Sequence, residues 1–161
     1  MLLIVAGRTA PNRAVVFGGE HGELDARGSR DVEQLKIGLD LPGRCAVRIG
    51  PEVSVRHTAR LLGLSGQVDP GLATLDLGSW CGQAPEQISA DELGPWFADP
   101  AAAPHGGETV AAFVARIGVH VTGLPADSLL VLAKPVVQGL LCIDASDFFA
   151  TDIRPASVHR Y

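Results

Sequence analysis

The chain has 161 residues, 47% of them apolar, and its 13 basic and 18 acidic side chains give a formal net charge of −5. This length and apolar content predict one folded domain over residues 1–161 rather than a disordered chain. The acidic balance argues against nucleic acid or an anionic membrane as the partner. The sequence has neither a bilayer-spanning apolar stretch nor the basic start of a secretory signal, so we expect a cytoplasmic protein.

Cysteine and histidine spacing gives no sign of a metal or redox centre. Cys45, Cys81 and Cys142 are far apart, which predicts free thiols rather than disulfides or a zinc motif. The histidines also lack the short spacings that are typical of metal ligands. We therefore expect no metal and no cofactor.

Short apolar runs and helical periodicities alternate along the first half of the chain. Residues 2–5 predict a strand buried on both faces, and residues 9–22 predict a loop. A helix is expected next, with Asp25 as its N-cap. Alternation over residues 45–49 predicts a second strand, and residues 52–64 have the spacing of a helix.

The second half predicts a loop over 72–82, a short helix over 85–93, a linker over 100–107 and a helix over 109–124. A strand over 129–133, a helix over 136–143 and an edge strand over 157–161 complete the chain. The order predicts an α/β fold, a three-layer α/β/α sandwich with a mostly parallel central sheet. Such sheets bind ligands at the carboxyl ends of their strands.

Five short motifs follow one another at or near these strand ends. They are residues 3–9, the segment from Gly50-Pro51 to Thr58-Ala59, Gly78-x-Trp80-x-Gly82, the run Gly107-Glu108-Thr109 with the residues before it, and residues 131–137. In this order and spacing the chain resembles the histidine phosphatase superfamily, which includes the cofactor-dependent phosphoglycerate mutases. The resemblance covers nearly the whole chain and implies the same α/β/α sandwich.

The resemblance also implies where the family's nucleophile would lie. Members carry Arg-His-Gly-Glu after the first strand, and the histidine attacks phosphorus. Aligned on this chain, the arginine falls on Val5, the histidine on Ala6, the glycine on Gly7 and the glutamate on Arg8. Alanine offers no lone pair for the attack.

Three further family positions are changed as well. The second phosphate-binding arginine falls on Ser54, the general-acid glutamate on Thr74 and the second histidine on Lys134, followed by Pro135 where a glycine is usual. A phosphohistidine mechanism needs an imidazole, cations on the phosphoryl oxygens and an acid for the leaving group. We therefore expect neither phosphatase nor mutase activity.

Several side chains near these positions have two interpretations. Lys134 either binds an anion or acts as an amine of lowered pKa, or else it reaches water or pairs with an acid. Arg8 either restores positive charge to the pocket or lies on the surface. Glu108 is favoured as a cap at a helix start, where a negative charge is favourable, His105 as a solvated loop residue and Cys81 as an unreactive thiol.

The expected ligand pocket is lined by Ala6, Arg8, Thr9, Ser54, Thr74, His105, Glu108 and Lys134. We expect it to bind a small, anionic molecule, and we leave open whether it transforms that molecule with Lys134 as the candidate group. The alternative is a non-catalytic pseudophosphatase that binds a protein partner. The insertions that cover the family's pocket look short here, so the cavity is expected to be open or shared in a homodimer. A lysine-poor, arginine-rich composition favours a bacterial source and a biosynthetic role.

Overall fold

A five-stranded sheet with the order β3-β2-β4-β1-β5 organises the residues that the computed structural model describes, namely 1–11, 14–39 and 45–161. Strands β1 (Leu2–Val5), β4 (Leu129–Leu132), β2 (Val47–Ile49) and β3 (Gln67–Val68) are parallel. Strand β5 (Val158–Arg160) pairs antiparallel with β1 at the edge. The predicted α/β fold with a mostly parallel sheet is confirmed.

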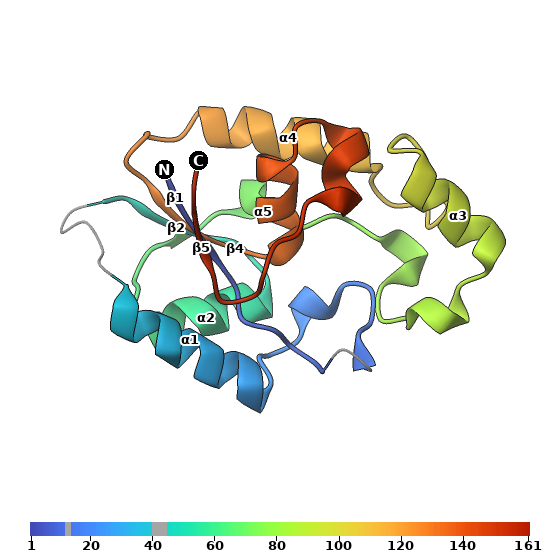
Figure 1. Cartoon of the computed structure of the whole chain (residues 1–161). Helices are drawn as coiled ribbons and strands as arrows, with labels where there is room; N and C mark the ends of the chain where they lie inside the picture. The colour runs from blue at the N-terminus through green and yellow to red at the C-terminus, as the bar shows by residue number, and fades with distance from the viewer. Residues whose placement is uncertain (12–13, 40–44) are drawn as a thin grey trace.

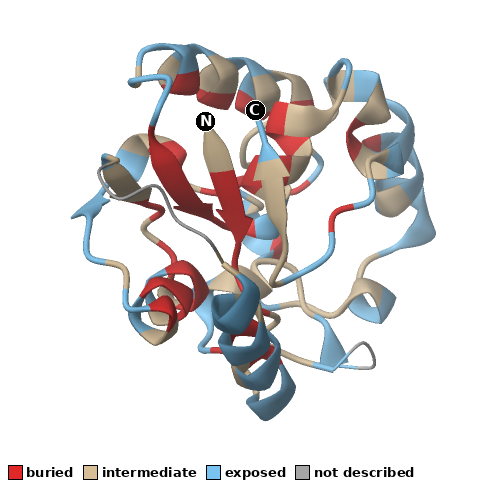
Figure 2. Ribbon diagram, turned by 60° about the vertical axis from the view of Figure 1, so that its left-hand side comes forward, coloured by how far each residue is buried: buried red, intermediate tan, exposed pale blue. Residues whose placement is uncertain are grey.

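Helices cover both faces of the sheet (Figure 1). Helices α1 (Ala26–Gly38) and α2 (Val53–Leu62) lie on one face, and α4 (Val110–Thr122) and α5 (Lys134–Leu141) lie on the other. Helix α3 (Ala90–Ala98) lies to one side of these layers. Figure 2 shows buried residues on the central strands and on the inward sides of the helices. No helix in the described residues is long and apolar enough to cross a membrane.

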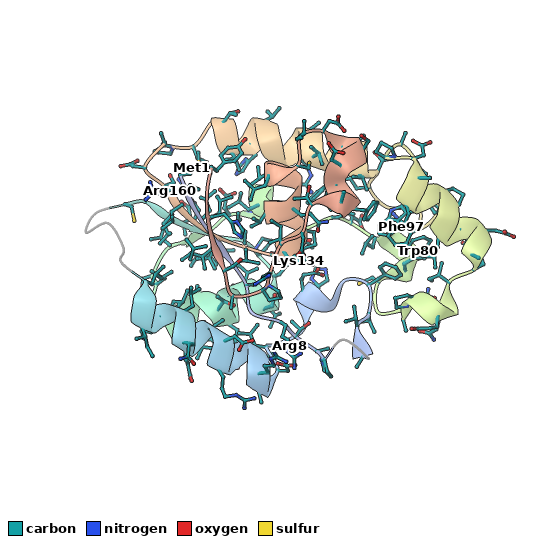
Figure 3. All side chains as sticks on the ribbon, in the orientation of Figure 1. Met1, Arg8, Trp80, Phe97, Lys134 and Arg160 are labelled. Atoms are coloured by element: carbon teal, nitrogen blue, oxygen red, sulfur yellow. The ribbon has the colours of Figure 1, made fainter. Side chains whose placement is uncertain are left out.

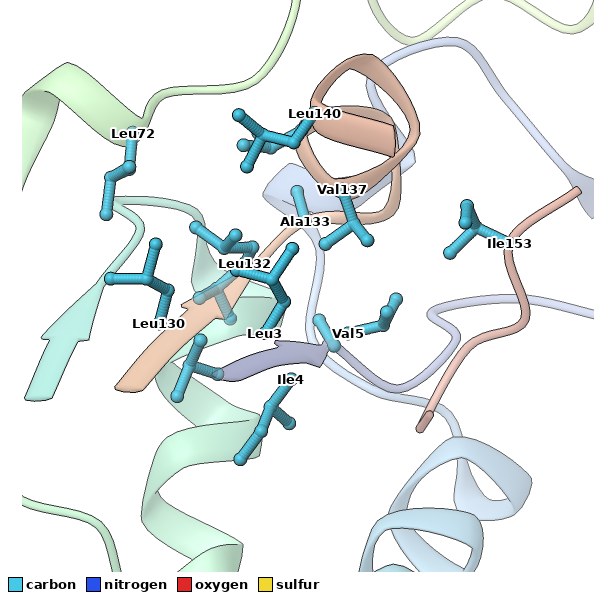
Figure 4. Packing of buried hydrophobic residues seen from close by; sticks show 14 of the residues in the cluster. Leu3, Ile4, Val5, Leu72, Leu130, Leu132, Ala133, Val137, Leu140 and Ile153 are labelled. Atoms are coloured by element: carbon cyan, nitrogen blue, oxygen red, sulfur yellow. The ribbon is translucent and has the colours of Figure 1, made fainter. Parts of the chain in front are cut away.

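The core forms because β1 and β4 are apolar on both faces. All four residues of β4 and three of the four in β1 are buried. Val137 and Leu140 of α5 pack over one face of these strands, while Ile4 points from the other face toward α2 (Figure 4). Each fully buried aliphatic side chain of this kind contributes about 1.5–3 kcal/mol through removal from water.

Most predicted elements are confirmed, including the first helix and its cap. The Asp25 carboxylate accepts the Gly28 N–H at 2.6 Å, as an N-cap aspartate should.

The helix predicted over 85–93 is wrong in its bounds. A 3-10 turn, η5 (Pro85–Gln87), comes first, and α3 begins only after Ser89 because Ile88 between them is extended. The two-residue β3 was not expected, since both its residues are exposed and carry no apolar pattern.

Lys134 differs most from its expected place. We expected it to end a strand, but Ala133 has extended backbone angles and Lys134 is the first residue of α5. Pro135 is accommodated in this first turn, where its missing N–H needs no partner within the helix. The Lys134 side chain is exposed, which agrees with the interpretation in which it reaches water and not with that of a desolvated amine.

Candidate functional site

A cavity of about 310 Å³ lies where the parallel strands end. Its wall is formed by the segment after β1, by a loop around η2 (Gly19–His21), and by the first turns of α2 and α5. Of the expected pocket residues, five line it: Ala6, Arg8, Thr9, Ser54 and Lys134. The topology explains this convergence, because ligand crevices of parallel sheets form at the carboxyl ends of the strands.

Arg8 enters this cavity while held by an ion pair. Its Nη2 lies 2.9 Å from Asp25 Oδ2, and its Nε donates to Asp25 Oδ1 at 3.2 Å. The Gly28 N–H, and then Arg8, hold the pKa of Asp25 below its usual value. Figure 3 shows Arg8 beside α1 and Lys134 at the start of α5. Arg8 is therefore fixed in place, whereas Lys134 is exposed and forms no ion pair with any of the described residues.

Glu20 brings a carboxyl group to the same cavity. It is half-buried, and this burial raises its pKa, although the charges of His21 and Lys134 act in the opposite direction. A carboxyl of raised pKa holds its proton at higher pH than an exposed glutamate does. Glu20 is thus a group of the cavity that can exchange a proton.

The N-terminal ends of two helices also reach the cavity. Ser54 is the second residue of α2 and is only 1% exposed, and Lys134 is the first residue of α5. The N-terminus of a helix carries partial positive charge from its unpaired N–H groups. Together with the two cations, these ends make the cavity suitable for an anion.

Thr74, His105 and Glu108 do not line this cavity. His105 is not the solvated loop residue we expected. It is 2% exposed, its ring lies edge to face against Trp80 at 5.1 Å, and its Nδ1 accepts the Gly107 N–H at 3.0 Å. Burial lowers its pKa, which favours the neutral ring. It is part of an aromatic cluster with Trp80 and Trp96.

Glu108 does not cap α4, which corrects the favoured interpretation. Thr109 is the N-cap, and its hydroxyl accepts the Ala112 N–H. The Glu108 carboxylate forms a two-pronged ion pair with Arg116, at 2.8 Å to Nε and 2.9 Å to Nη2. Such a fork of parallel N–H bonds is the favoured geometry between arginine and a carboxylate.

Thr74 lines a second cavity, of about 340 Å³, together with His21, Glu52 and Asp76. Glu52 is 3% exposed, and its Oε1 accepts the Thr74 N–H at 2.6 Å. Desolvation raises the pKa of Glu52, and the charge of Glu20 raises it further. Glu52 was missed because a glutamate at a helix start normally indicates only a favourable charge there.

Arg116 was also missed in the sequence, where it lies beside the apolar stripe of α4. Its Nη2 donates to the carbonyl oxygen of Ala73 at 3.1 Å, and its Nη1 donates to that of Gly71 at 3.3 Å. Arg116 therefore positions the 71–74 segment, of which Ala73 and Thr74 line the second cavity. The sequence signal that could have indicated a structural role for Arg116 is its position directly before the buried Ile117.

No metal centre is formed by the described residues, since no three histidine, cysteine, aspartate or glutamate side chains there are grouped to hold an ion. The thiols of Cys45, Cys81 and Cys142 are free, as expected. Cys81 is exposed, and its Sγ lies close to Gly18.

Comparisons with known proteins agree with the fold. The model of the histidine phosphatase superfamily, branch 1, matches residues 1–159. TTHB049 from Thermus thermophilus superposes with a TM-score of 0.78 at 26% identity, over 98% of this chain and 89% of that one. A mycobacterial glucosyl-3-phosphoglycerate phosphatase superposes with a TM-score of 0.79 at 23% identity, over 98% and 87% of the two chains. A search of curated protein sequences finds no match.

The buried carboxyl of Glu52 should make stability depend on pH. Because its folded pKa is raised, the folded state keeps a proton that the unfolded state loses above about pH 4.3. The contribution of Glu52 to the free energy of unfolding is greatest below that pH, decreases as the pH rises to the folded pKa, and is constant above it. Glu52→Gln still accepts the Thr74 N–H but lacks this pH-dependent contribution. The free energy of unfolding of the variant minus that of wild type should therefore rise over this window in urea titrations.

The matched control is Glu33→Gln, which removes the same charge from an exposed position on α1. Its free-energy difference from wild type should stay within about 0.5 kcal/mol at every pH. A Glu52→Gln difference that is equally flat would mean that the carboxyl is not desolvated in solution.

Proposed function

The chain belongs to the histidine phosphatase superfamily, and we propose that it uses the first cavity to bind a small anionic molecule without phosphohistidine chemistry. One observation carries the proposal: the cavity joins Lys134 and Arg8 to Ala6, a side chain with no nucleophilic atom. The cations and the two helix ends favour an anion. Ala6 stands where the family resemblance expects the attacking histidine.

The rest of the lining supports the loss of phosphoryl transfer. Among the described residues of the first cavity there is no histidine to form a phosphohistidine. Thr74, at the expected position of the general acid, lines the other cavity, and a hydroxyl is too weak an acid for that step. Glu20, whose pKa is raised by burial, is the carboxyl residue among the described lining of the first cavity and so its candidate for proton transfer.

The structural relatives support an anion as the ligand class. The mycobacterial glucosyl-3-phosphoglycerate phosphatase was also solved in complex with VO3, an oxyanion, and that structure superposes with a TM-score of 0.78 at 25% identity. Its name makes phosphatase activity the competing function for this chain. Binding to a protein partner is less supported, because the most exposed large apolar side chains among the described residues, Ile37, Val119 and Ile143, belong to three different segments.

The first test is a phosphatase assay. The purified chain should release no inorganic phosphate above buffer background from p-nitrophenyl phosphate, 3-phosphoglycerate or glucosyl-3-phosphoglycerate, because no imidazole is available to attack phosphorus. Phosphate release is measured colorimetrically across pH 5–8. Turnover that co-purifies with the chain and disappears in Lys134→Met would overturn the proposal.

The second test removes the exposed cation. Lys134→Met should weaken the binding of sulfate by about 1.4-fold to about five-fold, as expected for a charge contact in solvent worth about 0.2–1 kcal/mol. The loss should shrink as ionic strength rises. Amide chemical-shift titration, followed at Ser54, measures the dissociation constant.

Lys36→Met is the matched control for this test. Lys36 is the only other lysine in the sequence, and its Nζ donates to the Leu61 carbonyl on the outer side of α2. This variant should leave sulfate affinity unchanged, and Lys134→Met should leave stability within about 0.5 kcal/mol of wild type because the side chain is exposed. Equal sulfate affinity in both variants would remove Lys134 from the anion site.

The third test uses pH. Protonation of Glu20 removes a negative charge beside Lys134, so sulfate affinity should rise as pH falls through the raised pKa of Glu20. In Glu20→Gln the affinity at neutral pH should be higher and its pH dependence smaller. His21, Glu52 and Arg8 also contribute charge here, and His21→Gln separates the histidine's share. A profile unchanged by Glu20→Gln would show that Glu20 does not face the anion.

A further inference from the structure

Two residues that line the second cavity each carry a buried polar atom that lacks a partner within the described part of the chain. They are Glu52 Oε2 and Thr74 Oγ1. Glu52 is 3% exposed and Thr74 is 8% exposed, so bulk water reaches neither group freely. A buried polar atom without a hydrogen bond is costly. A hydrogen-bond donor from outside the chain would therefore be favoured beside these two atoms.

Local structure does not account for the burial of Glu52. The residue occupies the N-cap position of α2, but its side chain makes no capping hydrogen bond. The nearby guanidinium of Arg116 already binds Glu108 and the carbonyls of the 71–74 segment. Gly50 leaves room for the carboxyl, since a Cβ there would lie 2.8 Å from Glu52 Oε2.

The charges around this cavity favour a cation. The carboxyl residues Glu52 and Asp76 line it. The charge of Glu20 in the first cavity raises the pKa of Glu52, and the charge of His21 lowers it. Arg116 faces the same carboxyl from α4, but its charge is matched by Glu108. The second cavity is thus lined by two acidic residues and no lysine or arginine among the described residues, whereas Lys134 and Arg8 line the first.

We propose that Glu52 and Thr74 form a subsite for a primary ammonium group, and that the ligand spanning the two cavities is a zwitterion with its anionic group at Lys134. An ammonium has three N–H donors and no acceptor, so it can donate to Glu52 Oε2 and to Thr74 Oγ1 at once. The anionic end of this inference rests on the function proposed above, while the ammonium end rests on Glu52 and Thr74 alone.

Binding at this subsite is coupled to a proton. Desolvation raises the pKa of Glu52, and an ammonium binds the ionised carboxylate, so a proton leaves Glu52 when the ligand arrives. Ammonium affinity should therefore rise with pH until Glu52 is ionised in the free protein. Sulfate affinity in the first cavity has the opposite pH dependence, which distinguishes the two subsites.

The experiment compares ω-aminoalkyl phosphates of two to five carbons with alkyl phosphates of the same lengths, by calorimetry at pH 5–8. Propylammonium and propanol test the second cavity without an anionic group. The best-fitting amino compound should bind about ten-fold or more tightly than its alkyl partner, as charge-assisted hydrogen bonds allow. Glu52→Gln should abolish this gain, and Thr74→Val should reduce it. Calorimetry in two buffers of different ionisation enthalpy should detect proton release in wild type but not in Glu52→Gln.

Glu33→Gln on the exposed face of α1 is the charge control and should change nothing. Unfolding curves check that Glu52→Gln and Thr74→Val are folded. Amino compounds that bind no better than alkyl compounds, together with equal binding of propylammonium and propanol, would overturn the ammonium subsite. If alkyl phosphates fail to bind but propylammonium binds in a Glu52-dependent way, the anion cavity is wrong and the ammonium subsite stands.

Discussion

The parallel pairing of β4 with both β1 and β2 is the constraint on which the two cavities depend. Val5 is opposite Leu132, and Ile49 is opposite Val131, so these three strands end at nearly the same level. Ala6 N–H then donates to the Leu132 carbonyl, and Gly50 N–H donates to that of Val131. The chain leaves all three strands along one edge, where α2 and α5 begin. A slip of one residue would turn each strand's side chains to the other face and separate these groups.

Two helices and two loops meet at this edge of the sheet. This arrangement places the basic residues at the first cavity and the acidic residues Glu52 and Asp76 at the second. The first cavity collects cations and helix N-termini, because α2 and α5 start at it. Ala73 and Thr74 line the second cavity. Arg116 holds their segment, residues 71–74, by donating hydrogen bonds to the segment's carbonyl oxygens. Because that arginine is matched by Glu108, it shapes the wall without neutralising Glu52. The turn η2 contributes to both cavities, with Glu20 lining one and His21 the other.

The fold was largely predictable from the sequence, because the signals for it are local. Apolar runs in β1 and β4, the Asp25 cap and the stripe of α4 each depend on neighbouring residues only. The order of motifs then indicated the family and the edge at which Ala6, Arg8, Ser54 and Lys134 would meet. The exposure of Lys134 was not predictable, because it depends on whether α5 begins at residue 134 or at residue 136.

The second cavity was not predictable for a different reason. The burial of Glu52 depends on the 71–74 segment, and that segment depends on Arg116 and Glu108, which come much later in the chain. No spacing within one element records such a contact. His105 shows the same limit, because its glycine-rich neighbours indicate a loop while Trp80 and Trp96 bury its ring.

The exposure of Lys134 has a consequence for the size of the ligand. An exposed lysine contributes little free energy to holding an anion, because water screens the pair and the side chain loses conformational freedom. The helix N-termini add a favourable electrostatic field but do not hold the anion in one position. Arg8 is already paired with Asp25. A small inorganic anion should therefore bind weakly in the first cavity. Specific recognition needs a second contact that is desolvated, and Glu52 Oε2 and Thr74 Oγ1 are buried and lack a partner among the described residues. A molecule that reaches both cavities gains from each contact while losing its translational freedom only once.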